Sequence, residues 1–248
     1  MKLEEKIKDK YLYSYGLNIF KFLYFNFQYF KAKFKPRIIN ANWALDLIVD
    51  NIFRKKKEGI YVDVGCHHPF INNNTYLLYK KGWKGINIDL DFSSIDMFNY
   101  FRPKDHNIQI ALSNKICFTD LYFFHNRAAK NTITKSRGKG AKLIKRVKTD
   151  TLNNIIKNSK INTKKIDFLS IDVEGNELNV LKGLNFKKYR PKIISIEFIK
   201  PNVKEFYQHD IKNIFKSDVY KFMISKKYKL VNWIHDDLIF ISKTSKML

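Results

Sequence analysis

Cysteine is scarce in this sequence, and long hydrophobic runs are absent. Only Cys66 and Cys117 occur among 248 residues, so the chain has no disulfide framework and no Cys/His spacing typical of a metal site. No run reaches the roughly 18 apolar residues that are needed to cross a bilayer. The N-terminus contains Glu4, Glu5 and Asp9 where a signal peptide would have its apolar core. We therefore expect a protein of the reducing cytoplasm.

Acidic residues are also few. The chain has 23 acidic and 47 basic residues, which gives a net charge of +24 and an isoelectric point near 9.8. Lys supplies 40 of the basic residues and Arg only seven, whereas surfaces that bind nucleic acid usually favour the planar guanidinium of Arg. We favour the interpretation that the excess reflects A/T-rich codons and solvated Lys faces. Attraction to nucleic acid or to anionic lipid headgroups is the alternative.

The length of the chain suits one α/β domain with an extension. We expect residues 1–55 to form a helical, basic and aromatic N-terminal extension, and residues 56–248 to form the main domain. Within the extension, residues 18–35 (NIFKFLYFNFQYFKAKFK) are dense in aromatic side chains with Lys between them. We favour a helix that packs over the sheet with its Lys stems snorkelling to water. A peripheral membrane contact through residues 12–36 is the alternative.

Strand-like and helix-like segments alternate from residue 60 onward. The strand candidates are Ile60–Val64, Gly85–Leu90, Ile108–Leu112, Ile166–Ile171, Ile193–Phe198, Lys229–Trp233 and Leu238–Ser242. The helix candidates are 41–53, Asn73–Lys81, Asp150–Asn158, Asn176–Lys182 and Val203–Ile214. This alternation predicts an α/β fold with a mainly parallel, seven-stranded sheet that ends in an antiparallel hairpin. The basic residues 125–149 are interpreted as a loop over the ligand-binding edge, with room for a short hairpin.

Acidic residues follow the first two predicted strands. Asp63-Val64-Gly65 ends the strand that begins IYV, and Asp89 ends the next one. Ligands bind at the carboxyl ends of parallel strands, and a carboxylate after the second strand can accept hydrogen bonds from both hydroxyls of a ribose. Asp91 is the competing candidate, and either acid can instead cap the helix that follows. The turn after Gly65 lacks GxGxxG, so a ligand without a pyrophosphate fits better than NAD.

A second group of acids surrounds Gly175. Asp172 follows the apolar run FLSI at the end of a strand, where the buried sheet meets the predicted cleft. Glu174 can accept a hydrogen bond from a substrate or cap the next helix, whereas Glu177 supports the start of that helix. Glu197 lies near the end of the strand KIISIEF. These positions predict a carboxylate cluster at the same edge of the sheet.

His67 and His68 lie at this edge as well. A histidine there can take a proton from a hydroxyl near neutral pH, although a loop histidine often has only a packing or hydrogen-bonding role. Both could join Asp172 and Glu197 around a divalent cation, but no spacing motif supports that arrangement. We expect no metal ion.

Several strings of the chain occur together in the order typical of one family. They are YVDVG (61–65) with HHPF (67–70), KGWKGINID (81–89), VKTDTLNNI (147–155), IDFLSIDVEGNELNVLKGL (166–184) and KIISIEF (192–198). Over roughly residues 58–200 the chain thereby resembles the FkbM family of S-adenosylmethionine-dependent methyltransferases. The resemblance implies a Rossmann-like class I methyltransferase fold, S-adenosyl-L-methionine as the methyl donor, and O-methylation, often of sugars in surface polysaccharides.

The resemblance also implies roles for individual residues. Asp63 and Gly65 would hold the methionine end of the cofactor, Asp89 the ribose, and residues near Ala111 would border the adenine. The cofactor-binding residues implied are Asp63, Val64, Gly65, Cys66, Asp89, Leu90 and Ala111. The catalytic residues implied are Asp172 and Glu174, which would face the transferred methyl group and the acceptor, and His67. The family's usual turn has small residues and a further glycine where this chain has Cys66-His67-His68-Pro69.

The leading hypothesis is therefore a sugar O-methyltransferase of surface polysaccharide or related glycan biosynthesis, in the cytoplasm or at the inner face of the membrane. Its acceptor would be a glycan or another small hydroxylated molecule. The first alternative is an RNA ribose methyltransferase that uses the basic surface. The second is a membrane-surface protein that keeps the fold but has lost catalysis.

Overall fold

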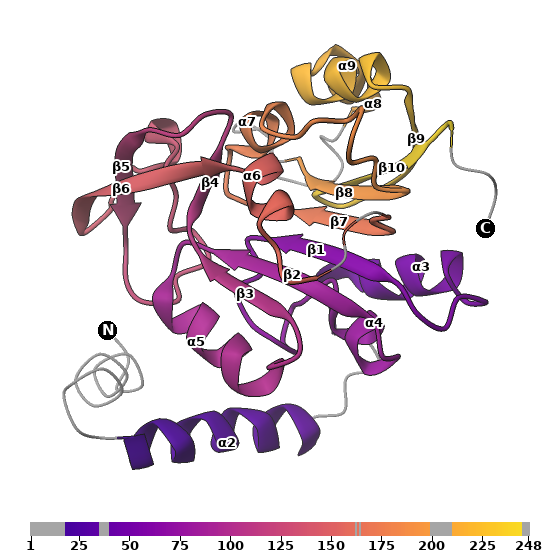
Figure 1. The fold of residues 1–248 in the computed structure, drawn as a ribbon. Helices are drawn as coiled ribbons and strands as arrows, with labels where there is room; N and C mark the ends of the chain where they lie inside the picture. Colours follow the sequence, from indigo (N-terminus) through magenta and orange to yellow (C-terminus); the bar gives the residue numbers. More distant parts are fainter. Residues whose placement is uncertain (1–17, 35–39, 162, 164, 199–209, 245–248) are drawn as a thin grey trace.

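The computed structural model describes residues 18–34, 40–161, 163, 165–198 and 210–244 (Figure 1). Its main sheet has seven strands in the order β3-β2-β1-β7-β8-β10-β9. The strands are β1 (Ile60–Val64), β2 (Lys84–Asp89), β3 (His106–Gln109), β7 (Phe168–Ile171), β8 (Ile193–Glu197), β9 (Tyr228–Ile234) and β10 (Asp237–Ser242). Strands β3, β2, β1, β7 and β8 run parallel, and β10 is antiparallel to both β8 and β9. The predicted parallel sheet with a C-terminal antiparallel hairpin is confirmed.

Helices cover both faces of this sheet. They are α3 (Leu45–Ile52), α4 (Tyr76–Lys80), α5 (Phe92–Phe101), α6 (Leu152–Lys157), α7 (Glu177–Lys182), α8 (Ile211–Lys216) and α9 (Asp218–Ser225). Successive side chains of a strand point to opposite faces: Val62 and Val64 pack with residues of α6, α7 and α9, whereas Tyr61 packs with residues of α3 and α4. The sheet is therefore buried on both sides, and its strand ends are where polar groups can reach solvent.

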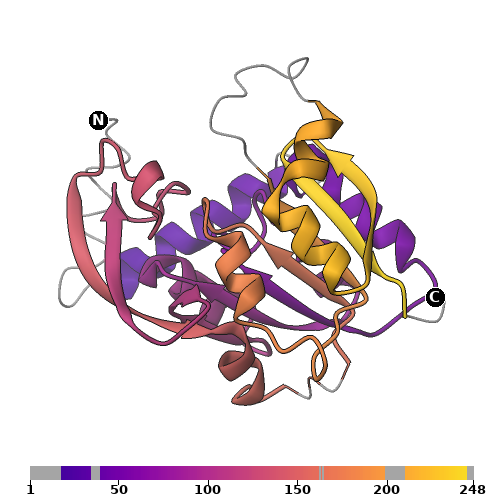
Figure 2. The same cartoon turned by 90° about the horizontal axis from the view of Figure 1, so that it is seen from above.

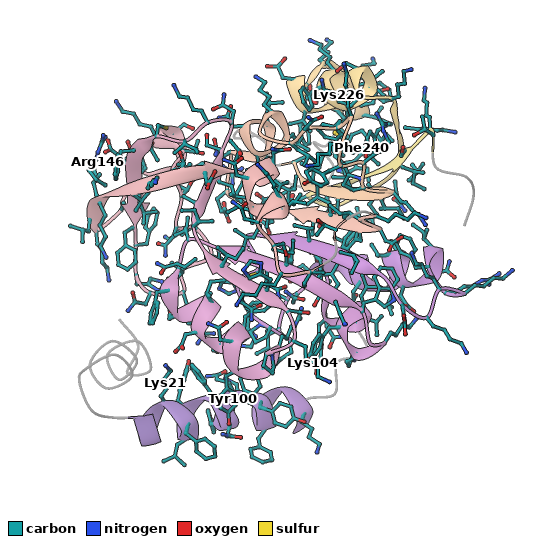
Figure 3. All side chains as sticks on the ribbon, viewed as in Figure 1. Lys21, Tyr100, Lys104, Arg146, Lys226 and Phe240 are labelled. Carbon is teal, nitrogen blue, oxygen red and sulfur yellow. The ribbon has the colours of Figure 1, made fainter. Side chains whose placement is uncertain are left out.

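The N-terminal helix α2 (Asn18–Phe34) lies outside these two layers and packs on α5 (Figure 1). Phe25 is 1% exposed, and its ring lies 5.8 Å from that of Tyr100 and 6.2 Å from that of Phe101. Lys21 pairs with Asp96 of α5 at the same junction (Figure 3). Among the described helices, none is long and apolar enough to span a bilayer. The domain boundary at residue 55 stays a prediction.

A small second sheet differs from the expectation. It consists of β4 (Ala111–Ser113), β6 (Leu143–Thr151) and β5 (Phe118–Phe123), in the order β4-β6-β5. The predicted strand 108–112 is thus divided between the two sheets, and much of the predicted loop 125–149 belongs to β6. Residues 143–146 are all exposed, so this part of β6 lacks the hydrophobic alternation that marks a half-buried strand. In Figure 2, β5 and β6 lie at one end of the molecule, apart from α8 and α9.

Two helix predictions also need correction. The helix expected over 73–81 begins only at Tyr76, because Asn73 and Thr75 bind Asp63 and therefore belong to a polar turn. The helix expected over 203–214 is observed as α8, which begins at Ile211; residues 203–209 lie outside the described residues. Both corrections leave the order of the strands unchanged.

Candidate active site

A cleft opens at the carboxyl ends of β1, β2 and β7. Its space is about 1060 Å³, including the part open to solvent. The cleft is lined by every residue predicted to bind the cofactor or to catalyse, namely Asp63, Val64, Gly65, Cys66, His67, Asp89, Leu90, Ala111, Asp172 and Glu174. The parallel strands bring these residues together from three distant parts of the sequence.

Gly65 forms the narrowest part of the cleft wall. Its φ of +78° lies in the left-handed region, and a Cβ atom there would sit 1.6 Å from the carbonyl oxygen of Asp172. The amides of Gly65 and Cys66 both donate to the carbonyl of Ile88, at 2.8 and 3.2 Å. Only glycine fits this crossing of β1, β2 and β7, and the absent side chain leaves the backbone open to a ligand.

Asp63 stands at the centre of a buried polar network beneath this turn. It is 3% exposed and accepts hydrogen bonds at Oδ2 from Thr75 Oγ1 at 2.7 Å and from Asn73 Nδ2 at 3.0 Å. Burial raises the pKa of Asp63, and the two donors and the nearby Arg102 guanidinium oppose that rise. Arg102 is fully buried and donates to Asn73 Oδ1 at 2.8 Å and to Thr75 Oγ1 at 2.9 Å, as well as to the carbonyl of Pro69.

Asn73 and Arg102 were not singled out from the sequence, whereas Thr75 belongs to the Asn74-Thr75 pair that follows HHPF in the resemblance to the FkbM family. Asn73 and Thr75 lie in a segment that was interpreted as helix, and Arg102 follows the last residue of α5. Only a search for partners of the buried Asp63 carboxylate would have pointed to their role in this network, because such a group needs donors close by. Together they fix the shape of the turn that follows β1.

Asp89 ends β2 with both carboxylate oxygens turned toward backbone amides. Oδ2 accepts from the amide of His67 at 2.9 Å, and Oδ1 accepts from that of Asp91 at 2.8 Å. Burial raises the pKa of Asp89 to about 7, against the lowering effect of these two amides. Each oxygen keeps a further lone pair, so Asp89 can accept two hydrogen bonds from a diol.

The competing candidate, Asp91, has a different task. It is the N-cap of α5, and its Oδ1 accepts from the amides of Ser93 at 2.8 Å and Ser94 at 3.3 Å. Its other oxygen accepts from the amide of Arg127 at 2.6 Å. Asp91 is therefore committed to the protein's own backbone, and Asp89 is the carboxylate of this pair that is suited to a ligand.

His67 is held between β2 and the loop that follows β5. Its Nε2 lies 3.2 Å from the carbonyl oxygen of Arg127, and because a carbonyl can only accept, Nε2 carries the proton. Burial lowers the pKa of His67, so the ring is neutral at physiological pH. The neighbouring His68 accepts at Nδ1 from the amides of Phe70 and Ile71, which makes it a structural part of the turn.

Three carboxylates meet at the ends of β7 and β8. One oxygen each of Asp172, Glu174 and Glu197 lies within 4.8 Å of the others. The Arg137 guanidinium joins them, with Nη1 at 2.5 Å from Glu174 Oε2 and 3.6 Å from Glu197 Oε2. Arg137 comes from the segment interpreted as a loop, and nothing in the sequence around it indicated this position.

The crowding of these acids changes their protonation. Burial raises the pKa of Asp172, repulsion from Glu174 adds to the rise, and a hydrogen bond with Glu197 opposes it. Burial together with repulsion from Asp172 raises the pKa of Glu197 to about 11. The pKa of Glu174 is raised less far from its usual value because Arg137 opposes the effect of burial. Asp172 remains accessible to solvent because it faces the cleft. Two carboxylates this close favour a state in which they share one proton. Asp172 and Glu197 can therefore hold one proton between them and still accept a second.

The backbone around the cluster is unusual. Glu174 has a φ of +56° and Gly175 a φ of +101°, which turns the chain sharply between β7 and α7. Glu177 stabilises this turn, since its Oε1 accepts from the amides of Val173 at 3.2 Å and Gly175 at 2.8 Å. Left-handed non-glycine residues are costly and gather at functional sites. Here the turn brings Glu174 to the Arg137 side of the cleft.

The residues of the cleft fit S-adenosylmethionine. The cofactor has no phosphate, which agrees with a turn that lacks the glycine-rich phosphate motif. Its ribose diol matches the two remaining lone pairs of Asp89. Gly65 lets the backbone of β1 pass directly beside the Asp172 carbonyl at the wall of the cleft. The carboxylates of Asp172 and Glu174 suit the positive charge of a sulfonium.

Comparisons with known proteins identify a family for this chain. The family model of the methyltransferase FkbM domain matches residues 63–226. A search among curated proteins finds no match. Among solved structures, the chain is similar to a TehB-like SAM-dependent methyltransferase from Corynebacterium glutamicum, with 11% identity, 91% of this chain and 99% of that chain covered, and a TM-score of 0.44. It is also similar to a protein assigned to the type 11 methyltransferases from Sulfolobus solfataricus, with 15% identity, 79% and 90% covered, and a TM-score of 0.38.

The assignment to a family rests on the family model alone, because that model matches more than half of the chain. The matched residues begin at Asp63 and include Asp89, Asp172 and Glu197, the acids that line or border the cleft. The chain therefore belongs to the FkbM family of methyltransferases, with S-adenosylmethionine as its cofactor.

Proposed function

We propose that the protein transfers a methyl group to a hydroxyl oxygen of a sugar, in the biosynthesis of a surface polysaccharide or a related glycan. The observation that carries this proposal is the position of Asp172. It faces the cleft directly beside Gly65, and it shares its site with Glu174 and Glu197. A hydroxyl must lose its proton when it is methylated, and a carboxylate of raised pKa is a suitable acceptor for that proton.

The other residues of the cleft would hold the cofactor. Asp89 would accept from the ribose hydroxyls, and the backbone from Val64 to Cys66 would border the methionine portion. Leu90 and the small Ala111 would lie beside the adenine. When bound, S-adenosylmethionine supplies a methyl group on a positively charged sulfur, and the chain's contribution is to align the acceptor oxygen with that group.

The proton of the acceptor would pass to the carboxylate pair. Asp172 faces the cleft, and Glu197 lies behind it with Arg137 Nη1 at 3.6 Å. When the acceptor oxygen gains its methyl carbon, the proton moves from that oxygen to Asp172, and the negative charge of the pair falls by one. His67 was also predicted as a catalytic residue; its Nε2–H points to the Arg127 carbonyl, which leaves Nδ1 as the nitrogen that could serve.

Two features of the cleft rim support a sugar as the acceptor. Asparagine side chains line the cleft beside the acids, including Asn42 and Asn74, and an amide can both donate to and accept from hydroxyl groups. Trp43 follows Asn42, is 57% exposed, and stacks on His235 with ring centroids 4.0 Å apart. One face of the indole is thereby fixed, and such a ring is a platform on which the apolar face of a sugar can lie.

The test is a transfer assay with radiolabelled S-adenosylmethionine and a panel of nucleotide sugars, oligosaccharides and RNA. We expect label in an O-methyl sugar, identified by mass spectrometry after hydrolysis. The variant Asp172→Asn keeps the shape of the side chain but not its basicity, so it should lower the rate at least about 100-fold and leave the affinity for S-adenosylhomocysteine, whose sulfur is uncharged, unchanged. Label found only in RNA or on an amine would contradict the proposal.

RNA ribose methylation is the second candidate. It is favoured by β6, which exposes Lys145, Arg146 and Lys148 on the small sheet. The Arg146 side chain is 67% exposed, and its ion pair with Asp120 lies at the surface (Figure 3). Phosphates could bind such a face without sequence preference. RNA in the acceptor panel distinguishes the two functions.

A further inference from the structure

The helix α2 has two different faces. Its inner face holds Phe25 and Tyr29, which contact the rings of Tyr100 and Phe101 on α5. Lys21 is on the same side and pairs with Asp96. These contacts fix the rotation of α2 about its axis, and they determine which of its side chains point away from the protein.

The outer face carries a stripe of large apolar side chains. Its members are Phe22, Leu23, Phe27 and Phe30, which are 52%, 54%, 59% and 48% exposed. At about 100° per residue these positions span about 140° of the helix surface. Phe22 lies at the edge nearest α5, where its ring also contacts that of Tyr100, and the other three lie farther from α5. Single exposed apolar residues are ordinary, but a contiguous apolar stripe on a water-soluble surface marks a binding site. We call these four residues the outer stripe.

The charges around the outer stripe have one sign. No acidic residue occurs in α2, and its last turn carries Lys31 and Lys33, both exposed. The sequence continues with Lys35 and Arg37, and the whole chain has a net charge of +24. An apolar stripe rimmed by cations is complementary to a bilayer with anionic headgroups, where each Lys or Arg near the surface is attracted and the rings enter the interface.

We propose that α2 is a docking helix that lies in the plane of an anionic membrane surface, with the outer stripe inserted at the headgroup level. The helix is described over 17 residues and, at about 1.5 Å per residue, presents roughly 26 Å of length to that surface. It lies on the membrane without crossing it.

The docking helix is joined directly to the wall of the cleft. Tyr24 lies on α2, and its hydroxyl accepts from Arg127 Nη1 at 2.8 Å. Arg127 lines the cleft, and its carbonyl oxygen meets His67 Nε2. A membrane bound by α2 therefore has a fixed orientation relative to the active site, which would present the cleft to acceptors held at the surface.

Vesicle flotation of the full-length protein tests this proposal. We expect the wild type to float with vesicles of phosphatidylcholine and phosphatidylglycerol, and at least tenfold less with phosphatidylcholine alone. The triple variant L23S/F27S/F30S should lose flotation at least tenfold. The variant F118S/I144S is the matched control, because it removes side chains that are 65% and 58% exposed on the small sheet, and it should float like the wild type.

Calorimetric titration with S-adenosylhomocysteine distinguishes a failure of membrane docking from a failure of the proposed cofactor site. The triple variant should bind it like the wild type, which also shows that the variant is folded. Wild-type protein that does not float, or a triple variant that floats equally, would overturn the proposal. So would a wild-type dimer that the triple variant converts to a monomer without any vesicle binding, because the outer stripe would then be a contact between two copies of the chain.

Discussion

In the proposed site, two residues shape the cofactor side of the cleft, Gly65 and Asp89. Gly65 does it by having no side chain, and Asp89 by having two oxygens that each carry one backbone donor and one unused lone pair. The rest of the cleft wall can vary in chemistry without changing these two constraints. Both positions therefore allow sharp tests.

Replacing Gly65 with alanine should damage the fold and the site together. The left-handed backbone costs a non-glycine residue roughly 1–2 kcal/mol, and the added Cβ would also collide with the Asp172 carbonyl. Gly140 has a similar φ, +82°, but a Cβ added there would meet no heavy atom within 4 Å, so Gly140→Ala shows the backbone effect alone. Urea denaturation should find Gly65→Ala the less stable variant, and equal stability of the two would contradict the collision.

Cofactor affinity should depend on pH through Asp89. The carboxyl has a pKa of about 7 in the free protein, and hydroxyl donors of a ribose favour its ionised form, so binding releases a proton. The affinity should rise as the pH increases from about 6 to 8, with a slope that approaches tenfold per pH unit below the pKa. Titration calorimetry across this range measures the slope. Asp89→Asn should retain only the pH dependence of the cofactor itself, and an unchanged slope would contradict the role of Asp89.

At the scale of elements, the ends of the strands were more predictable than the segments between them. The strands β1, β2, β7 and β8 are mostly apolar runs that end in or beside acids, as is typical of strands buried on both faces. The site residues could therefore be placed from the sequence. The strand β6 could not, because its exposed basic residues follow no hydrophobic alternation. Arg137 lies in the segment that was placed over the ligand-binding edge, but the sequence did not indicate which of its basic residues meets the carboxylates.

The turn after β1 was missed for a different reason. Its stability comes from Arg102, which lies far from it in the sequence and reaches it only through the packing of α5. Hydrophobic periodicity indicates which faces of elements are buried, but it does not indicate which buried cation will meet which carboxylate. The partners of Asp63 therefore became visible only in the structure.

Replacing Arg102 with leucine should destabilise the protein by about 3–5 kcal/mol. Arg102 is fully buried, so its loss leaves the polar partners in the turn unpaired and Asp63 without a nearby positive charge. Arg146→Leu is the matched control, since its pair with Asp120 is exposed and should contribute about 0–1 kcal/mol. Urea unfolding of both variants measures the difference. A loss below about 1 kcal/mol for Arg102→Leu would show that the turn does not depend on it.

At the scale of the whole molecule, the basic residues behind the net charge of +24 can be located on the structure. Basic residues flank the outer stripe of α2 and lie along β6, which is at one end of the molecule in Figure 2. On α2 they accompany the outer stripe, and on the small sheet they accompany the exposed side chains of Phe118, Leu143 and Ile144. The helix offers one apolar face that can enter a bilayer, so we expect the charge to act at a membrane surface more than on RNA.

Binding of RNA should accordingly be weak and dominated by salt. We expect measurable binding to a generic single strand at low ionic strength, a steep fall with added salt, and no detectable binding at about 150 mM. Fluorescence anisotropy with labelled RNA over a salt series measures this. Tight binding that persists at that ionic strength would instead favour the RNA ribose methyltransferase.

Calorimetric titration with S-adenosylmethionine, for the wild type and for Asp89→Ala, is the most direct test of the cleft as a cofactor site. The arrangement of Gly65, Asp89 and Asp172 predicts micromolar binding to the wild type and a loss of at least about 100-fold in the variant, because the ribose then has no carboxylate acceptor. No binding to folded wild-type protein, or equal binding by Asp89→Ala, would contradict the assignment of this cleft.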